Sequence, residues 1–540
     1  MQKQNNSAIA STGFSRRTVL KTALSSSLAL GGSLMLPAWA QDIRNAKPTA
    51  EVKTSGGRLR GVMQGGVNAF FGVPYAEPAV GALRFAAPVA VKPWQGVKDA
   101  VQIGHRSPQD VLAGRACVSE VFALDRAEPL GEDCLNINVW SPALDQGKRP
   151  VMVWLHGGGY SSGSGNWLLY DGARLAMNQN VVVVSVTHRL NVFGYLYLAG
   201  LGGDQFADSG NAGMLDIVAV LQWVRDNAAA FGGDAGNVTI FGQSGGAGKV
   251  CTLLALESAQ GLFHKAIAMS GAANGGVKPE QATAQAERFL KQLGLQKNQV
   301  GKLRELPMEQ LIKASIEVPG LNTSPVADGK HLKREPFAAN APSKAVPLLM
   351  GSMEHEVNFF ATTPVEPMDA ATLEKTLVQS TRRDAAGVAA LLATYKKEFG
   401  ERSNEEYNQI IGSDNFRRGV LAAAGQKAAQ GGAPAYMYYF NWQSTAREGK
   451  LRAFHCLDIP FAFDNVDVSA SMTGAGQDRY ELATRMSTAF ANFARTGNPN
   501  HAGLPTWPTY DDATRATMFM NAKPAVVNNP FPASRKALYG

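Results

Sequence analysis

Short apolar runs alternate with longer amphipathic segments along most of this chain. Val151–Leu155 and Val181–Val186 are almost entirely apolar, which predicts strands that are buried on both faces of a sheet. Leu135–Trp140 alternates in polarity, as expected for a further strand, and Val346–Gly351 and Tyr436–Trp442 predict two more. These runs together predict a large sheet at the centre of the fold.

Apolar residues at helical spacing occupy the segments between these strands. Leu215–Phe231 has apolar positions three and four residues apart and ends at two glycines, which favour a helix terminus. Glu481–Arg495 predicts a late helix that ends at Gly497. Strands that alternate with helices indicate an α/β fold, in which a mostly parallel sheet is covered by helices on both faces.

The first strands of the chain and two long helix-rich segments are also predicted from the pattern. Val52–Val62 and Asn68–Val73 are expected to form antiparallel strands joined by a turn at Gly65-Gly66. The segments 281–345 and 368–432 are helix-rich and lack buried-strand runs. They are therefore expected to be insertions that cap the sheet rather than extend it.

The composition fits one large domain better than several small ones. The 540 residues are 45% hydrophobic and 18% charged, which is ordinary for a globular protein with a large core. Since there is no internal repeat and no long linker, residues 41–540 are expected to form a single domain. Four cysteines are too few for a disulfide scaffold, and no Cys-x-x-Cys pair suggests zinc. No metal and no cofactor are expected.

The basic net charge does not predict nucleic-acid binding. The first 40 residues hold four basic side chains and no acidic ones, so they supply half of the formal charge of +8. The remainder has no dense run of lysine and arginine with interleaved aromatic residues. Nucleic acid is therefore not expected as a partner.

The first 40 residues are interpreted as an export signal. Ser15–Lys21 resembles the twin-arginine motif, with Val19 where phenylalanine is usual. A modestly apolar stretch follows, and Ala38-Trp39-Ala40 is a cleavage site of the A-x-A type. That stretch is too short and too rich in serine and glycine for a membrane anchor. The mature protein is expected to begin at Gln41, without an anchor, in the periplasm or outside a bacterial cell.

One glycine-rich turn has the pattern of a nucleophile elbow. Val238–Phe241 predicts a strand, Gly242-Gln243-Ser244-Gly245-Gly246 follows, and Lys249–Glu257 is compatible with a helix. Gly-x-Ser-x-Gly between a strand and a helix exposes the serine hydroxyl on a tight turn above the sheet. Ser244 is therefore the candidate nucleophile.

A serine nucleophile needs a histidine base, which a carboxylate in turn orients. In this fold the chain order is serine, acid, histidine, so the histidines before Ser244 are excluded. His264 lies too close behind the elbow to leave room for the acid. The histidines that remain are His331, His355, His455 and His501. His455 soon follows the strand predicted at Tyr436–Trp442, so it is the best candidate for the base.

The acid and the oxyanion hole are expected at the carboxyl ends of strands. Glu354 and Glu356 both follow the strand predicted at Val346–Gly351, and composition does not choose between them. His156-Gly157-Gly158-Gly159 follows another strand and matches an oxyanion loop, whose backbone N–H groups would act with that of Gly245. Phosphate binding by this loop is disfavoured because no P-loop lysine follows it.

Several ordered motifs resemble those of the type B carboxylesterase family, which includes cholinesterases, bile-salt lipases and bacterial para-nitrobenzyl esterases. The resemblance extends from about Gly57 to Tyr510 and implies the α/β-hydrolase fold. Its motifs are Phe71–Ala76, Glu132–Asn136, Gly157–Gly159, Asn211–Asp216, Phe231–Asp234, the elbow and Phe493–Pro499.

The resemblance also assigns roles to individual residues. Glu356 lies four residues before the second residue of the Phe359-Phe360 pair, as the family's acid does, so it is chosen over Glu354. The family's His-x-x-Glu/Asp-Ile/Leu-Pro-Phe motif falls on His455–Phe461. By the same resemblance the oxyanion donors are Gly158, Gly159 and Gly245.

This chain departs from the family pattern at the elbow and at one cysteine. Gln243 replaces a glutamate, which should weaken any attraction for cationic substrates, and Gly245 replaces an alanine. The family joins the cysteine of its Glu-Asp-Cys motif to one upstream, where this chain has Ser107. The resemblance therefore implies a Cys117–Cys134 disulfide in an oxidising compartment.

The sequence thus predicts an exported serine esterase that hydrolyses small neutral or aromatic esters through an acyl-enzyme. An amidase, a carbamate hydrolase or a lactonase could use the same residues. A non-catalytic binding protein is a further alternative, since neuroligin-like members of the family are adhesion modules. Such members usually lose the triad serine, and Ser244 is present here.

Overall fold

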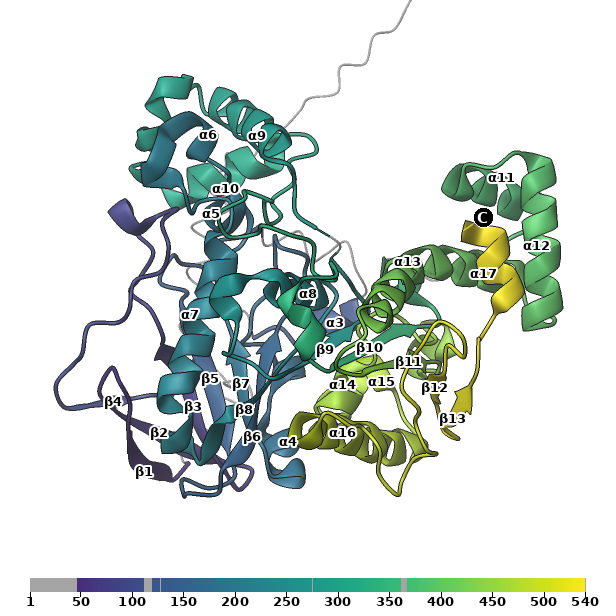
Figure 1. The fold of residues 1–540 in the computed structure, drawn as a ribbon, viewed down its shortest axis with the longest axis horizontal. Coiled ribbons are helices and arrows are strands. Elements are labelled where there is room, and N and C mark those ends of the chain that lie inside the picture. Colours follow the sequence, from purple (N-terminus) through teal and green to yellow (C-terminus); the bar gives the residue numbers. More distant parts are fainter. Residues whose placement is uncertain (1–45, 111–118, 127, 274, 361–366, 540) are drawn as a thin grey trace, which may run out of the picture. The chain divides into compact units, whose positions relative to one another are not determined.

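A single large sheet organises the chain. The computed structural model describes residues 46–110, 119–126, 128–273, 275–360 and 367–539. Along the sheet the strands run in the order β1-β2-β3-β5-β7-β6-β8-β9-β10-β11-β12-β13, and β4 pairs with β2 (Figure 1). The strands are β1 (Pro48–Lys53), β2 (Arg58–Gln64), β3 (Val67–Pro74), β4 (Val97–Asp99), β5 (Asn136–Ser141), β6 (Arg149–Leu155), β7 (Val182–Val186), β8 (Gly233–Gln243), β9 (Lys265–Met269), β10 (Leu348–Met353), β11 (Ala435–Phe440), β12 (Thr517–Met520) and β13 (Ala525–Val527).

The middle of the sheet is parallel and its two ends are antiparallel. Strands β7, β6, β8, β9, β10, β11 and β12 pair in parallel, while β1, β2, β3 and β5 pair in antiparallel, as do β12 and β13. The predicted strands are confirmed, with one correction. Val52–Val62 is not one strand, because Thr54 and Gly57 exchange backbone hydrogen bonds of 2.8 and 3.2 Å in a turn that separates β1 from β2.

Helices connect the strands and cover the sheet. They are α3 (Ser119–Phe122), α4 (Ala173–Gln179), α5 (Asn191–Tyr195), α6 (Ala199–Gly202), α7 (Ala212–Asn227), α8 (Gly245–Ala255), α9 (Pro279–Gln292), α10 (Met308–Glu317), α11 (Ala370–Thr381), α12 (Ala385–Phe399), α13 (Asn404–Ala429), α14 (Ile459–Ala462), α15 (Ala470–Thr473), α16 (Asp478–Thr496) and α17 (Pro532–Tyr539). Helix α7 ends at Asn227, and a 3₁₀ turn continues the chain to Phe231, so the predicted stop at Gly232 caps this turn rather than the helix. Helix α16 ends before Gly497, as predicted, and both glycines are left-handed.

The run Val151–Leu155 of β6 shows why the middle of a central strand is apolar. Successive side chains of a strand point to opposite faces. Val151 and Val153 pack into the core cluster that contains α7 and α8. Trp154 points to the other face, where its ring lies 5.0 Å from those of Tyr170 and Phe463. Because both faces are covered, no position of the strand can be polar at low cost.

The two helix-rich insertions build hydrophobic clusters of their own. One cluster joins α5, α9 and α10 around Phe289 and Leu303. The other joins α11, α12 and α13 around Leu377 and Tyr395. Figure 1 shows each group of helices gathered beyond the sheet. Within the described residues, neither insertion adds a strand to the sheet, as the sequence predicted.

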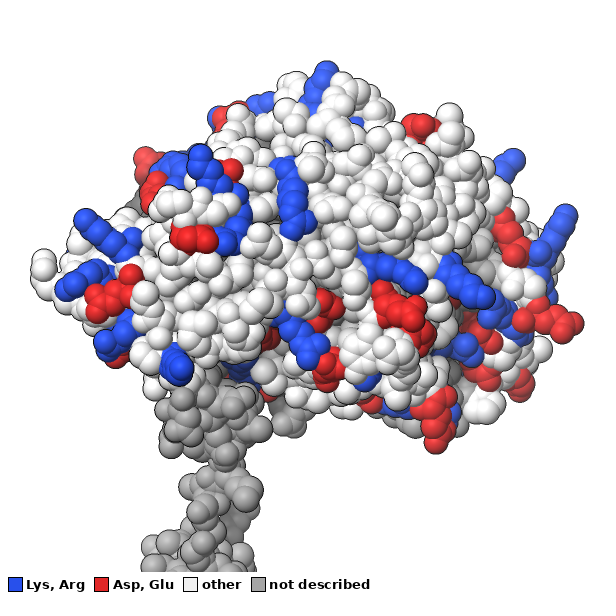
Figure 2. All heavy atoms as spheres, turned by 90° about the horizontal axis from the view of Figure 1, so that it is seen from below, with Lys and Arg blue, Asp and Glu red and all other residues white. Residues whose placement is uncertain are grey.

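Charges of both signs are interspersed on the face seen in Figure 2. On that face the described lysine and arginine side chains form no continuous basic stripe of the kind that follows a nucleic-acid backbone. No helix in the described part of the chain is long and apolar enough to cross a bilayer.

Candidate active site

Ser244 lies on a strained turn between β8 and α8. Its backbone has φ 58° and ψ −122°, a conformation that a non-glycine residue adopts only when its surroundings enforce it. Two hydrogen bonds hold the turn, from Ser244 N–H to Met269 O at 2.8 Å and from Gly248 N–H to Ser244 O at 3.0 Å. The predicted elbow geometry is therefore present, although α8 begins at Gly245 rather than at Lys249.

The oxyanion loop lies directly against this turn. A Cβ at Gly245 would come within 2.2 Å of Gly159 O and 2.5 Å of Gly159 N, so this contact requires glycine. Gly158 and Gly159 have φ of 86° and 62°, which also favour glycine. The contact places Gly159 directly against Gly245, so two of the three predicted oxyanion donors are neighbours.

His455 and Glu356 form a buried pair. His455 Nδ1 lies 2.5 Å from Glu356 Oε2, and Glu356 Oε1 accepts the Met353 N–H at 2.8 Å. Both side chains are almost completely buried. A backbone hydrogen bond of 3.0 Å from His355 N–H to Ala453 O ties the two loops together. Glu354, the other candidate acid, instead accepts a hydrogen bond of 2.8 Å from the Gln443 side chain.

Gln243, directly before Ser244, contacts the other nitrogen of this imidazole. Since Nδ1 donates to Glu356, Nε2 is left with the lone pair, and the Gln243 amide nitrogen lies 3.1 Å from it. The Cys456 thiol donates to the Gln243 carbonyl oxygen at 3.3 Å and so fixes the orientation of the amide. Ser244 itself is half-buried, and its hydroxyl has no hydrogen-bond partner within the described chain.

Two aromatic rings pack on the imidazole of His455. The centroid of Phe359 lies 5.3 Å from it and that of Phe416 lies 5.2 Å from it, both edge to face. The rings exclude water from the Glu356–His455 pair, which strengthens its electrostatic interaction. Phe416 comes from α13, a helix that sequence analysis assigned only to the cap.

The other candidate histidines have partners or surroundings of a different kind. His331 Nε2 lies 2.7 Å from Asp208 Oδ1. His501 contacts the Arg485 carbonyl at 3.0 Å. His355 is buried, and desolvation lowers its pKa to about 3. His331 thus also pairs with a carboxylate, but among the described contacts only His455 reaches the residue directly before Ser244.

Ser244 opens into a cavity of about 550 Å³. This volume is in the range of small-molecule sites. Every described residue that lines the cavity is uncharged. Its lining consists of Tyr160, Ser244, Gly245, Gly248, Ser270, Gly271, Ala272, Ala273, Gly275, Gly276, Val277, Asn322, Ser324, Pro325, Phe416, Gly419 and Val420.

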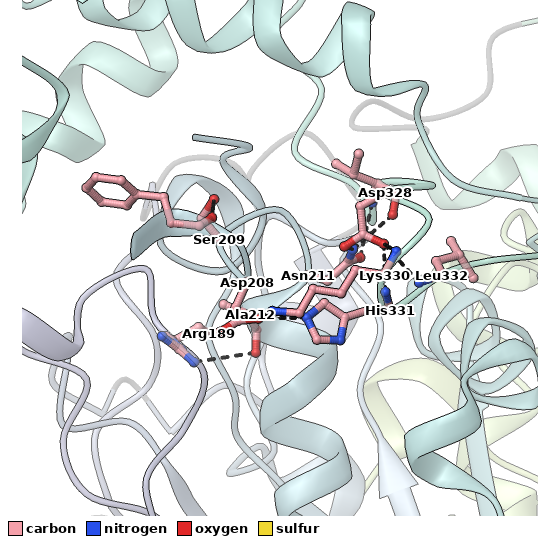
Figure 3. Close-up of polar contacts among 11 residues, drawn as sticks. Arg189, Asp208, Ser209, Asn211, Ala212, Asp328, Lys330, His331 and Leu332 are labelled. Carbon is pink, nitrogen blue, oxygen red and sulfur yellow. Dashed lines mark hydrogen bonds and ion pairs between the residues drawn. The ribbon is translucent and has the colours of Figure 1, made fainter. Parts of the chain in front are cut away.

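A polar cluster holds the segment that follows Pro325, a residue of the cavity lining (Figure 3). The Asn211 amide donates to Val326 O and to Asp328 Oδ2, both at 2.9 Å, and Asn211 Oδ1 accepts the Val326 N–H. Asp328 Oδ1 accepts the backbone N–H groups of residues 330, 331 and 332. These contacts anchor the segment after Pro325 to the start of α7, which gives the Asn211 motif a structural role.

The sequence of the chain is similar to those of known esterases. The model of the carboxylesterase family matches residues 48–537. The chain belongs to the carboxylesterase family. It is 35% identical to the para-nitrobenzyl esterase of Bacillus subtilis over 502 residues, which are 90% of this chain and 98% of that protein. It is 34% identical to the phenmedipham hydrolase of Pseudarthrobacter oxydans over 477 residues, which are 85% of this chain and 92% of that protein.

The solved structures agree with this assignment. The crystal structure of a Geobacillus stearothermophilus carboxylesterase superposes with a TM-score of 0.78 at 35% identity, covering 91% of this chain and 100% of that one. The predicted α/β-hydrolase fold is thereby confirmed. The protein is a carboxylic ester hydrolase, as predicted, and its family acts on small-molecule esters.

In this carboxylesterase the predicted disulfide stays a prediction, because Cys117 lies outside the described residues. Cys134 is fully buried, and desolvation raises the pKa of its thiol to about 12. Cys251 is buried in α8, where desolvation likewise raises its thiol pKa to about 11, as expected for a small apolar residue rather than a nucleophile.

We expect the Gln243→Glu variant of this carboxylesterase to need a higher pH for activity. A carboxylate at this fully buried position would face His455 Nε2 and stabilise the protonated imidazole. The acid limb of the kcat/KM profile should therefore move up by about one pH unit. The measurement is kcat/KM for a neutral aryl ester between pH 5 and 9.

Gln243→Met is the matched control, since it removes the amide without adding charge. It should lower kcat/KM while leaving the acid limb where it is in the wild type. If the glutamate variant keeps the wild-type limb, Gln243 does not contact the imidazole that acts in catalysis.

Proposed function

We propose that this carboxylesterase is an exported serine enzyme whose triad is Ser244, His455 and Glu356. The observation that carries the proposal is the buried Glu356–His455 pair, whose other ring nitrogen contacts the residue directly before Ser244. Ser244 lines an uncharged cavity on a strained elbow. Such strain persists where the surrounding structure enforces it, which is common at active sites.

Acylation begins when the Ser244 hydroxyl attacks the ester carbonyl carbon. His455 Nε2 takes the hydroxyl proton, and Glu356 stabilises the imidazolium that forms and keeps its ring in place. The carbonyl electrons move onto oxygen, where the N–H groups of Gly158, Gly159 and Gly245 stabilise the charge. Collapse of this intermediate breaks the ester bond, and the alcohol leaves with the proton from His455.

Deacylation repeats these steps with water as the nucleophile. His455 removes a proton from water as it attacks the acyl carbonyl, and the same N–H groups bind the second oxyanion. Collapse releases the carboxylic acid and returns the proton to Ser244. No step of this cycle requires a redox or metal group, and no cluster of metal ligands occurs among the described residues.

Export is proposed on the N-terminal sequence. Ser15–Lys21 and the Ala38-Trp39-Ala40 site support a twin-arginine signal that is removed before Gln41. Twin-arginine export would deliver the folded enzyme to the periplasm or beyond.

The cavity supports a preference for neutral or aromatic esters. Its described lining carries no carboxylate to replace the hydration of a quaternary ammonium group. Gln243 supplies an amide where the related enzymes commonly have an acid. Tyr160 and Phe416 offer aromatic surface to an uncharged group.

The test is an ester panel on the purified mature enzyme. We expect kcat/KM for 3,3-dimethylbutyl acetate to exceed that for its cationic isostere acetylcholine at least about tenfold, which corresponds to about 1.4 kcal/mol. 4-Nitrophenyl acetate should be turned over faster than 4-nitroacetanilide. Equal values for the two isosteres would contradict the proposed preference, and faster anilide turnover would identify an amidase.

A further inference from the structure

Lys249 is a buried lysine directly beneath the oxyanion loop. It lies on α8 one turn after Gly245, and its side chain is completely buried. Its ammonium donates to Gly159 O at 2.8 Å and to His156 O at 3.1 Å. These carbonyls are the first and last of the loop His156–Gly159. Lys249 is not among the site residues predicted from the sequence, although a charge within an otherwise apolar helix is unusual.

The position is costly for a cation. Desolvation lowers the pKa of Lys249 to about 7. Lys249 also lies near the N-terminus of α8, where the helix dipole is positive. Within the described chain, the ammonium donates its hydrogen bonds to neutral carbonyl oxygens. A buried ammonium without a carboxylate is therefore destabilising unless an anion forms nearby during the reaction.

The orientation of the peptide groups in the loop His156–Gly159 gives a reason for a lysine at position 249. In a trans peptide group the C=O and the N–H point in opposite directions, so a partner for the carbonyl aims the N–H away from that partner. Gly157 O accepts from His156 Nδ1 at 2.8 Å, and Gly158 O accepts the Ser162 N–H at 3.1 Å. These two contacts aim the N–H groups of Gly158 and Gly159. Lys249 binds the carbonyls of His156 and Gly159, which belong to the peptide groups just before and just after these two.

We propose that Lys249 is a positioning residue of the oxyanion hole, which fixes the loop His156–Gly159 and lends its positive charge to the developing oxyanion. This inference rests on the proposed triad mechanism. In the resting enzyme the ammonium has no carboxylate partner among the described residues and contacts two carbonyls and the Tyr160 ring. It gains a negatively charged partner when charge develops on the substrate oxygen. The interaction is therefore stronger in the transition state than in the ground state, which is the condition for catalysis.

The same arrangement has a consequence for the pH profile. Among the described residues, the titratable groups that face Lys249 are His156 and His188, which follow β6 and β7, and Tyr160 in the loop. Burial and the neighbouring ammonium keep the pKa of both histidines low, so both are neutral at working pH. As pH rises through about 7, Lys249 loses its proton and kcat/KM should fall. Lys249→Met should lack this descending limb.

The experiment compares Lys249→Met with Lys427→Met in the full mature enzyme. Lys427, on α13, is a matched control because it is also buried and also donates to two main-chain carbonyls. Its ammonium lies 2.7 Å from Ser343 O and 3.2 Å from Lys344 O. Active sites are counted with a fluorophosphonate that labels the nucleophilic serine. The readouts are kcat per labelled site, KM, and the inhibition constant of an aryl trifluoromethyl ketone, which forms an oxyanion when bound.

We expect Lys249→Met to lower kcat per site about 10²-fold, the scale of losing one oxyanion donor, with KM within about threefold. The affinity for the ketone should fall in parallel, and Lys249→Arg should recover part of both. Lys427→Met should lower thermal stability but leave kcat per site unchanged.

Wild-type kcat per site and an unchanged pH profile in Lys249→Met would overturn the inference. If Lys249→Met fails to fold, Lys249→Arg and Lys249→Gln carry the test, and equal ketone affinities in these two would overturn it. Failure of the triad mechanism itself is distinguishable, because Ser244→Ala would then remain active.

Discussion

Replacing Ser244 by alanine is expected to lower kcat for 4-nitrophenyl acetate by about 10⁴-fold or more. The variant keeps the Glu356–His455 pair and the oxyanion loop but has no hydroxyl at the elbow. The side chain is half-buried and without a hydrogen-bond partner in the described chain, so its loss should cost little stability. The residual rate would come from binding and from the oxyanion donors alone. Initial rates at pH 8 and a thermal unfolding curve test both statements.

Ser270→Ala is the matched control for this variant. Ser270 lines the same cavity, also has positive φ (48°), and its buried hydroxyl is likewise without a partner among the described residues. Ser270→Ala should keep kcat within about threefold of the wild type, because in the proposed mechanism only the Ser244 hydroxyl attacks the ester. Fluorophosphonate labelling should add one adduct, on the peptide that contains Ser244. An adduct on Ser270, or full activity in Ser244→Ala, would reassign the nucleophile.

The central strands could be predicted because burial on both faces leaves an unbroken apolar run. Val151–Leu155 and Val182–Val186 have no polar face and therefore little ambiguity. The strands β1 and β2 at the edge of the sheet were harder to predict. Val52–Val62 has apolar and charged residues on both sides of Thr54–Gly57, and the pairing of β1 with β2 shows that the chain turns there. Strand pairing is a long-range property, which a local pattern does not contain.

The candidate nucleophile and base could be predicted because the chemistry constrains their order along the chain. The candidate acid and Lys249 were harder to predict because their contacts depend on packing. The elbow pattern and the order serine, acid, histidine led to Ser244 and His455. The choice between Glu354 and Glu356 came from family resemblance, and the pairing of the 355 and 454 segments is what brings Glu356 to His455. Lys249 was overlooked because patterns place lysines at the surface. Only the packed loop shows that its head reaches two buried carbonyls.

Replacing Glu356 by glutamine is expected to lower kcat by about 10³-fold or more. Glu356 accepts two hydrogen bonds, from His455 Nδ1 at 2.5 Å and from the Met353 N–H at 2.8 Å. An amide has one acceptor oxygen and one donor nitrogen, so it can satisfy only one of them. If the oxygen stays with Met353, the NH₂ faces Nδ1 and the proton must move to Nε2. His455 then presents N–H instead of a lone pair to Ser244 and cannot act as a base.

Glu354→Gln separates this tautomer effect from a general loss of negative charge. Glu354 lies two residues away, and its raised pKa reflects burial rather than a role with His455. Its partner, the Gln443 amide, still finds an acceptor when Glu354 becomes glutamine, so kcat should stay within about threefold of the wild type. The measurements are kcat for 4-nitrophenyl acetate and the imidazole proton resonances by NMR, where Glu356→Gln should shift the signal from Nδ1–H to Nε2–H. If Glu354→Gln loses activity and Glu356→Gln keeps it, the acid of the triad is the other carboxylate, and the contact between Glu356 and His455 serves the fold alone.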